Sequence, residues 1–195
     1  MKNYLLIVVL AAALSGCVSV AKVESGDRTV GERMVLTLDG AWNHINMPNS
    51  GPAQTWTMEG LAIDQLMIYS GLRDGELVHA ESRNPGSGSQ PKSFRFRAAM
   101  QPDEIVALFE GMFTRDGSQF ALSKLEPAPF VGEQGFRFDY TLTRRIDNVV
   151  LSGFGYCAVN KSQLFAVIYQ APRLTFFTRQ ARRVDAIARS ARVKG

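Results

Sequence analysis

The feature that most constrains the fold is the stretch from residue 135 to 172, which reads GFRFDYTLTRRIDNVVLSGFGYCAVNKSQLFAVIYQAP. Its first part alternates apolar and polar side chains with the period of two that is typical of a half-buried β-strand. The polar segments at 147–148 and 160–162 predict hairpin turns, so we expect three consecutive antiparallel strands. The third strand, Leu164 to Tyr169, is apolar on both faces, which indicates that other elements cover both sides of the sheet.

Two amphipathic helices can provide this cover. In QPDEIVALFEGMFTRDG, Pro102 suits the first helical position, Asp103 and Glu104 complement the positive end of the helix dipole, and the glycine at 117 can end the helix. The second helix is predicted from about Thr175 to Arg189, with one apolar side and its arginines on the exposed arc. The apolar face of the first helix has the i, i+3, i+4, i+7, i+8 spacing: Ile105, Leu108, Phe109, Met112 and Phe113.

The first half of the chain reads as shorter strands. RMVLTLDGAWNHI is an alternating run broken at Asp39-Gly40, and TWTMEGLAIDQLMIYSGL gives two runs divided at Gly60. The glycine-rich and serine-rich segment from Ser82 to Gln90 predicts a flexible loop. QFALSKLEPAPF predicts one more strand that ends at its prolines. We expect a single α+β domain over residues 30–195, built on an antiparallel sheet.

The amino terminus has the parts of a secretory signal over residues 1–16: Lys2, a short apolar stretch, and small residues before position 17. As a helix the apolar stretch reaches only about 16 Å, against a hydrocarbon core of roughly 30 Å, so a permanent span is the weaker interpretation. The quartet Leu14-Ser15-Gly16-Cys17 resembles the lipobox of bacterial lipoproteins. That resemblance implies cleavage between Gly16 and Cys17 and lipid attachment to Cys17. An ordinary secreted protein, with Cys17 incidental, is the alternative.

The lipobox resemblance also predicts where the protein resides. By similarity to lipoproteins sorted in Gram-negative cells, Val18, in place of aspartate, favours the outer membrane, facing the periplasm, and the inner membrane stays open. Residues 17–29 (CVSVAKVESGDRT) show no regular period and predict a lipidated flexible tether. With Cys17 acylated, Cys157 has no disulfide partner, and its β-rich surroundings favour a packing residue over a reactive thiol.

The second half resembles the PsbP/Mog1 type of domain. From Ser93 onward the predicted order is strand, helix, strand, three-stranded meander and helix, closing with YCAVNKSQLFAVIYQAP and VDAIARSARV. This resemblance implies an antiparallel sheet flanked by helices, and members of that superfamily are mostly non-enzymatic binding or assembly factors. It carries no functional residue over, because no site motif is matched.

The sequence shows no catalytic constellation and predicts no metal or cofactor. His44 and His79 are the only histidines, and neither stands in a metal-binding motif. Of the acidic pairs, Asp103 with Glu104 is explained by helix capping, and Glu59 with Asp64 straddles a turn. With 22 basic against 18 acidic residues, the formal net charge of +4 is too small to argue for nucleic acid as a partner.

Two groups of residues remain as candidate binding sites. Trp42, His44 and Trp56 lie on neighbouring predicted strands and would line a ligand cleft, although we favour the interpretation that both tryptophans pack in the core. An enzyme that uses His44 with a nearby carboxylate is a third and weaker hypothesis. The arginines of the closing helix would contact lipid headgroups or form a solvated helix face, which we favour: Arg179, Arg182 and Arg183.

These observations predict a membrane-anchored bacterial envelope lipoprotein that acts as a non-enzymatic binding or assembly module. Its partners would be the membrane, through the lipid on Cys17, and an unknown envelope protein or ligand. The alternative is a small-molecule or lipid binding protein that uses a cleft near Trp42 and Trp56.

Overall fold

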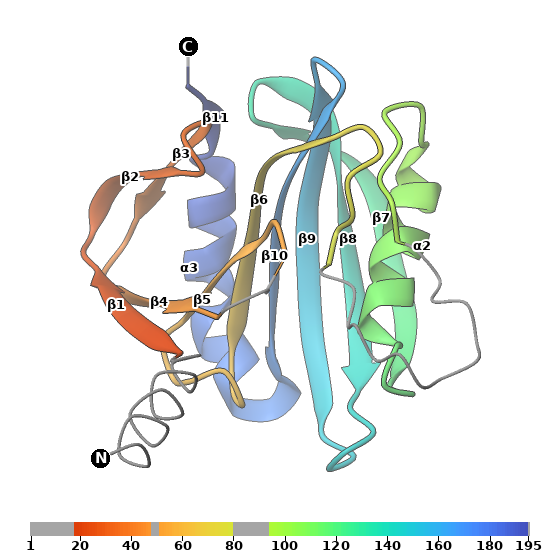
Figure 1. Ribbon diagram of the computed structural model, residues 1–195. Helices are drawn as coiled ribbons and strands as arrows, with labels where there is room; N and C mark the ends of the chain where they lie inside the picture. The colour runs from red at the N-terminus through yellow and green to blue at the C-terminus, as the bar shows by residue number, and fades with distance from the viewer. Residues whose placement is uncertain (1–17, 48–50, 80–93, 195) are drawn as a thin grey trace, which may run out of the picture.

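The computed structural model describes residues 18–47, 51–79 and 94–194, and these form two antiparallel sheets and two α-helices (Figure 1). The larger sheet has eight strands in the order β1-β4-β5-β6-β10-β9-β8-β7, and the smaller has the order β11-β3-β2. The strands of the larger sheet are β1 Ser19–Val23, β4 Trp42–Asn46, β5 Gln54–Thr57, β6 Gln65–Arg73, β10 Gln163–Pro172, β9 Val150–Asn160, β8 Glu133–Thr143 and β7 Gln119–Phe130. Those of the smaller are β2 Gly26–Val30, β3 Met34–Leu38 and β11 Arg192–Val193.

The three-stranded meander is confirmed as β8, β9 and β10. Its register places Phe138 of β8 opposite Gly155 of β9, and Tyr140 opposite Gly153. A Cβ atom built on Gly155 would lie 2.3 Å from the Phe138 ring, and one on Gly153 would lie 2.3 Å from the Tyr140 ring. The two glycines therefore give the aromatic rings of β8 the space to lie flat over β9.

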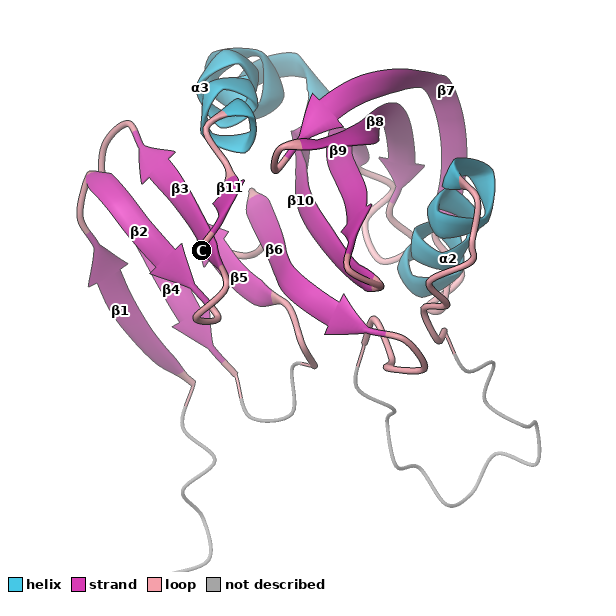
Figure 2. Cartoon of the chain, turned by 90° about the horizontal axis from the view of Figure 1, so that it is seen from above, coloured by secondary structure: helices cyan, strands magenta, loops and turns pink. Residues whose placement is uncertain are grey.

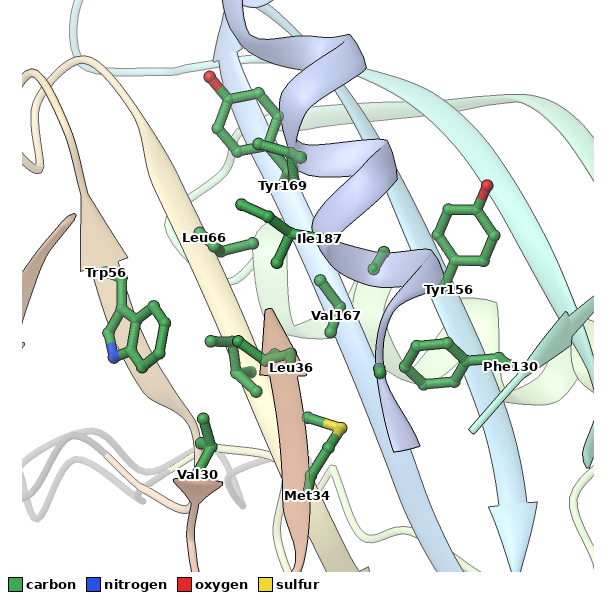
Figure 3. Close-up of a cluster of buried hydrophobic side chains, with 14 of the residues drawn as sticks. Val30, Met34, Leu36, Trp56, Leu66, Phe130, Tyr156, Val167, Tyr169 and Ile187 are labelled. Atoms are coloured by element: carbon green, nitrogen blue, oxygen red, sulfur yellow. The ribbon is translucent and has the colours of Figure 1, made fainter. Parts of the chain in front are cut away.

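Each face of the large sheet is covered by different elements (Figure 2). Helix α2 (Pro102–Phe113) packs on one face, where Phe109 stacks on Phe138 with ring centroids 6.2 Å apart. Helix α3 (Thr178–Arg189) and the small sheet pack on the other face. Figure 3 shows this second core, in which Leu36 of β3, Val167 of β10 and Ile187 of α3 meet. Cover on both sides explains why the middle strand β10 is apolar on both faces.

Both predicted helices form, with small differences at the ends. In α2, the Glu104 side chain accepts a hydrogen bond from the backbone of Gln101 at 2.7 Å, completing a capping box before Pro102. Helix α3 begins at Thr178 rather than near Thr175, because a π-helical turn, η2 (Arg173–Phe177), precedes it. Within η2, Phe177 stacks on Tyr169 at 6.0 Å, which anchors the turn to the sheet.

The prediction of a flexible tether over residues 17–29 is wrong from Ser19 onward. Strand β1 pairs with β4, with Val20 opposite Ile45, and β2 pairs with β3. The Asp27 carboxylate accepts a hydrogen bond from the Thr37 hydroxyl at 2.6 Å and pairs with Arg192 at 2.6 Å. Strand β1 pairs with a strand that is not its neighbour in sequence, and Asp27 meets Arg192 across 165 residues, so local pattern does not reveal these contacts. The folded body therefore begins at Ser19 and not at residue 30.

Strand β7 continues through the prolines that were expected to end it. Pro127 lies opposite Phe136 and Pro129 opposite Gln134. Because β7 is the last strand of the sheet, the backbone positions that point away from β8 have no partner strand. A proline lacks the N–H group and is tolerated at such edge positions.

Two predicted segments lie outside the described residues: the signal peptide with Gly16 and Cys17, and the loop from Ser82 to Gln90. Within the ranges that the structure covers, no helix has the length and apolar character needed to cross a bilayer.

Candidate functional site

A pocket of about 480 Å³ opens on the α2 face of the large sheet, and we call it the α2-face pocket. Its floor comes from β5, β6, β8, β9 and β10: Thr55, Met67, Tyr69, Leu142, Leu151 and Gln170. Met47, at the end of β4, closes one side, and Met112 and Phe113, at the end of α2, close another.

The pocket arises because the covering helix is shorter than the strands. Helix α2 has 12 residues and is about 18 Å long at ~1.5 Å per residue. Strand β8 has 11 residues and extends about 36 Å at ~3.3 Å per residue. Past the carboxyl end of α2 at Phe113, the sheet has no helix over it, and the inward side chains of the strands face an open space.

A chain of buried and partly buried hydrogen bonds crosses the pocket floor. The Tyr140 hydroxyl donates to Oε1 of Gln170 at 3.1 Å, and Nε2 of Gln170 donates to Oε1 of Gln65 at 3.1 Å. Nε2 of Gln65 then donates to the carbonyl of Leu61 at 3.0 Å. Gln170 is only 6% exposed. Because each amide has a fixed partner, the orientation of the two glutamines in the floor is set before any ligand arrives.

Tyr69, in the floor, and Tyr140, which donates to the floor residue Gln170, are neutral hydrogen-bond donors. Burial raises the pKa of Tyr69, and the nearby Cys157 adds to this effect. Burial also raises the pKa of Tyr140, with Tyr69 as a further cause. The Tyr69 hydroxyl donates to the carbonyl of Val78 at 3.0 Å, which ties the segment after β6 to the floor.

Charged and polar side chains gather at the mouth of the pocket. Burial lowers the pKa of His79, and the positive charge of Arg115 lowers it further, so His79 is neutral at neutral pH. Arg144 pairs with Asp147 through two hydrogen bonds, at 2.7 and 3.2 Å, and donates to the carbonyl of Ala62 at 2.6 Å. Arg115 is exposed and forms no ion pair with a described residue.

Ser118, Asp116 and His79 all line this mouth, so their geometry decides whether they resemble a hydrolytic triad. The Asp116 carboxylate accepts the backbone N–H of Ser118 at 2.9 Å, and the Ser118 hydroxyl accepts the backbone N–H of Arg145 at 3.1 Å. Among the described residues, no hydrogen bond joins His79 to either of them. Asp116 and Ser118 therefore shape the turn after α2.

The residues of the predicted tryptophan cleft do not line an open site. Trp42 is 0% exposed and Trp56 is 2% exposed, and both belong to the core on the α3 face. The His44 ring contacts Trp56 edge-on at a centroid distance of 6.4 Å, and burial lowers its pKa. No hydrogen bond joins His44 to a carboxylate, hydroxyl or thiol of the described residues. The tryptophans pack in the core, as the favoured interpretation had it, and the ligand cleft does not form there.

The three arginines proposed for headgroup contact have separate surroundings. Arg179 pairs with Glu59, and Arg183 approaches Asp39 at 3.5 Å, whereas no ion pair joins Arg182 to a described residue. These pairs connect the start of α3 to the loops after β3 and β5. Two of the three charges are therefore already partnered within the chain.

The remaining candidates have structural roles. Asp64 is fully buried and accepts hydrogen bonds from the Thr57 hydroxyl at 2.6 Å and the Glu59 backbone at 2.7 Å. Cys157 is a buried free cysteine whose pKa is raised by burial, which confirms it as a packing residue. In the described part of the chain, no three metal-ligating side chains of His, Cys, Asp or Glu cluster together.

Sequence reasoning missed the α2-face pocket. The signal was present in Gln65 and Gln170, two amides placed in otherwise apolar strands, and the register pairs them directly. A polar residue inside an apolar run indicates either a partner in the core or a polar contact to a ligand. The pocket itself depends on the relative lengths of helix and strand after folding, and no local pattern reports this.

The fold is similar to that of known structures, although the sequence matches no family model and no curated protein. The solution structure of cyanobacterial PsbP (CyanoP) from Synechocystis sp. PCC 6803 matches with a TM-score of 0.58 at 12% identity, over 93% of this chain and 96% of that one. The crystal structure of LpqN, involved in cell envelope biogenesis of Mycobacterium tuberculosis, gives a TM-score of 0.38 at 8% identity, over 94% and 87%. The likeness to CyanoP shows that this chain has an α+β, PsbP-like fold.

Proposed function

We propose that this chain is a bacterial envelope lipoprotein that binds a small amphipathic ligand, without chemical conversion, in the α2-face pocket. The observation that carries the proposal is the pocket floor, where apolar side chains surround the fixed amides of Gln65 and Gln170. A site that is mostly apolar with a few oriented polar groups is the usual form of a small-ligand site. The apolar part of the ligand lies over Met67 and Leu151, and its polar part faces the amides or the mouth.

The proposed lipid anchor on Cys17 rests on the lipobox resemblance. Because Val18, and not aspartate, follows the cysteine, we place the chain at the outer membrane, facing the periplasm. The position of β1 supports placing the anchor near the pocket. Ser19 lies opposite Asn46, and the next residue, Met47, lines the pocket. A lipid on Cys17 would then leave the folded body close to this side of the pocket.

Binding is tested in solution with N-phenyl-1-naphthylamine, an amphiphile whose fluorescence rises in apolar surroundings. Thr55 is half-buried at the floor, so Thr55→Trp fills the pocket, and we expect at least a ten-fold loss of affinity, about 1.4 kcal/mol. The matched control is Thr141→Trp, a half-buried β-strand threonine on the opposite face of the sheet. Equal affinities for the dye in the unmodified protein and the two variants, or an equal loss of affinity in both variants, would contradict the assignment of the pocket as the binding site.

The anchor is tested separately by mass spectrometry of the mature amino terminus. We expect a chain that begins at Cys17 and carries the mass of the acyl groups. An unmodified Cys17 at the mature amino terminus would show that this part of the proposal is wrong.

A further inference from the structure

Two neighbouring turns expose the most solvent-accessible large hydrophobic side chains among the described residues. Ile146, between β8 and β9, is 88% exposed, and Leu174, in η2 after β10, is 90% exposed. The register places these turns together, because Thr143 pairs with Val150 and Leu151 pairs with Pro172. Both turns lie at the lower end of the molecule in Figure 1. We call residues 144–149 and 173–177 the turn end.

Each turn is held by contacts that leave its apolar tip pointing outward. The backbone N–H of Arg144 donates to the carbonyl of Val149 at 3.0 Å, and that of Val149 donates to the Asp147 carboxylate at 3.1 Å. In η2, Phe177 packs on the sheet against Tyr169 and Phe154, while Leu174 stays in solvent. Both apolar tips are therefore exposed on turns that hydrogen bonds and packing hold in place.

Cations flank both tips. Arg144 and Arg145 precede Ile146, and Arg173 precedes Leu174. The acidic groups near these turns include Asp147, which pairs with Arg144, and Asp116, whose backbone carbonyl accepts from Arg145 at 3.0 Å. Glu59 pairs with Arg179, whose guanidinium lies 5.1 Å from the centroid of the Phe176 ring. Four guanidinium groups against these three carboxylates leave the turn end positive.

We infer that the turn end is a membrane-contact surface, at which Ile146 and Leu174 enter the headgroup region of an anionic bilayer and the arginines bind lipid phosphates. Two separate apolar tips on convex turns offer no continuous apolar area of the kind that a specific protein interface buries. Single apolar side chains with basic neighbours suit the interface of a bilayer. The apolar side chains can enter the acyl boundary there, while the basic side chains contact the lipid phosphates.

The membrane-contact surface is continuous with the α2-face pocket. Arg144 belongs to the turn end and also lines the mouth of the pocket, together with Leu61 and Ile63 from the loop before β6. Contact through the turn end therefore places the pocket mouth beside the lipid headgroups. The inference goes beyond the proposed function and requires neither a ligand in the pocket nor a lipid on Cys17.

The test uses the full chain with Cys17→Ser, so that an introduced cysteine is the single accessible thiol while Cys157 stays buried. Ile146→Cys, Leu174→Cys and Gln134→Cys are each labelled with an environment-sensitive nitrobenzoxadiazole dye. Gln134 is exposed at the opposite end of β8, where it pairs with Pro129. On vesicles of phosphatidylcholine and phosphatidylglycerol, we expect the emission to shift to shorter wavelength at positions 146 and 174 and to stay unchanged at 134.

All three labelled chains share the same amino-terminal segment, so differences among them report which end of the folded body meets the lipid. Equal emission at the three positions, or a shift at 134 alone, would overturn the inference. The charge is tested with Arg145→Glu and Arg173→Glu together, which we expect to reduce the shift at position 146. The matched control reverses the charges of Lys161 and Lys194, at the other end of the molecule, with Lys161→Glu and Lys194→Glu. An equal reduction of the emission shift by the two pairs of substitutions would also overturn the inference. Pocket binding is measured without vesicles, so the two proposals fail independently.

Discussion

At the scale of single residues, Asp64 shows how a carboxylate that stands out in the sequence acquires a structural role. The sequence pairs it with Glu59 across a turn, which is compatible with acid–base chemistry. In the structure the two carboxylates have different partners: that of Glu59 pairs with Arg179, while that of Asp64 is buried and accepts hydrogen bonds from the loop between β5 and β6. That loop carries Leu61 and Ile63, so Asp64 also positions one wall of the α2-face pocket.

We predict that Asp64→Ala lowers the free energy of unfolding by about 3 kcal/mol, because it leaves buried donors without an acceptor. Urea denaturation followed by circular dichroism measures the change. Asp103→Ala, in the exposed first turn of α2, is the control, and its expected loss is less than about 1 kcal/mol. A similar small loss for both variants would show that the loop does not depend on Asp64.

At the scale of elements, helix α3 is joined to the sheet by a cluster of charges centred on Asp185. Its carboxylate accepts from Arg137 of β8 at 2.5 Å and from the Tyr156 hydroxyl of β9 at 2.7 Å, and it pairs with Arg189 at 2.7 Å. The Arg137 guanidinium also lies 4.6 Å from the centroid of the Phe154 ring. The sequence predicted Arg137 on the polar face of β8, and the structure adds that α3 covers part of this face.

This cluster makes stability depend on pH. Burial alone raises the pKa of Asp185. Two influences outweigh burial and bring this pKa below its ordinary value of 3.8: the hydrogen bonds from Tyr156 and Arg189, and the positive charges of Arg189 and Arg137. The stabilisation is therefore complete above that value and is lost as the pH falls through the lower pKa of the folded state. We predict that Asp185→Asn costs about 2 kcal/mol at pH 7 and progressively less below pH ~4.

Urea titrations from pH 7 down to about pH 2 check this prediction. Asp39→Asn is the control, since Asp39 is 75% exposed and lies 3.5 Å from Arg183 of the same helix. We expect a cost below about 0.5 kcal/mol for it at every pH. A loss for Asp185→Asn that is constant with pH would mean that packing, and not charge, holds α3.

At the scale of the whole molecule, the local patterns predicted most of the elements and missed how the chain closes around them. The alternation of apolar and polar residues was sufficient to predict β8, and the capping residues were sufficient to predict α2, because each of these signals lies within one segment of sequence. Strand β1 was read as a tether, since only its pairing with β4 gives it structure. The α2-face pocket also escaped prediction, because it depends on where α2 ends over the sheet, and the two glutamines of its floor, Gln65 and Gln170, meet across 105 residues of sequence.

Hydrogen exchange measured by NMR distinguishes a paired β1 from a tether. We predict that backbone amides of Ser19–Val23 that donate to β4 exchange at least about 100-fold more slowly than in an unstructured peptide. The amide of Val18, just before the strand, serves as the unprotected reference. Exchange rates close to those of an unstructured peptide throughout β1 would support the flexible tether instead.

The two outer strands of the large sheet differ in what they permit a neighbouring molecule to do. Along β7, Pro127 and Pro129 remove donors from the outward edge, and Lys124 and Glu126 add charge. Along β1, the five residues Ser19–Val23 contain no proline. The edge of β1 is therefore more open to a strand from a second copy than the carboxyl-terminal half of β7, where Pro127 and Pro129 lie. Two copies that pair through β1 cover that edge in each other, and the prolines of β7 then restrict further growth of the large sheet.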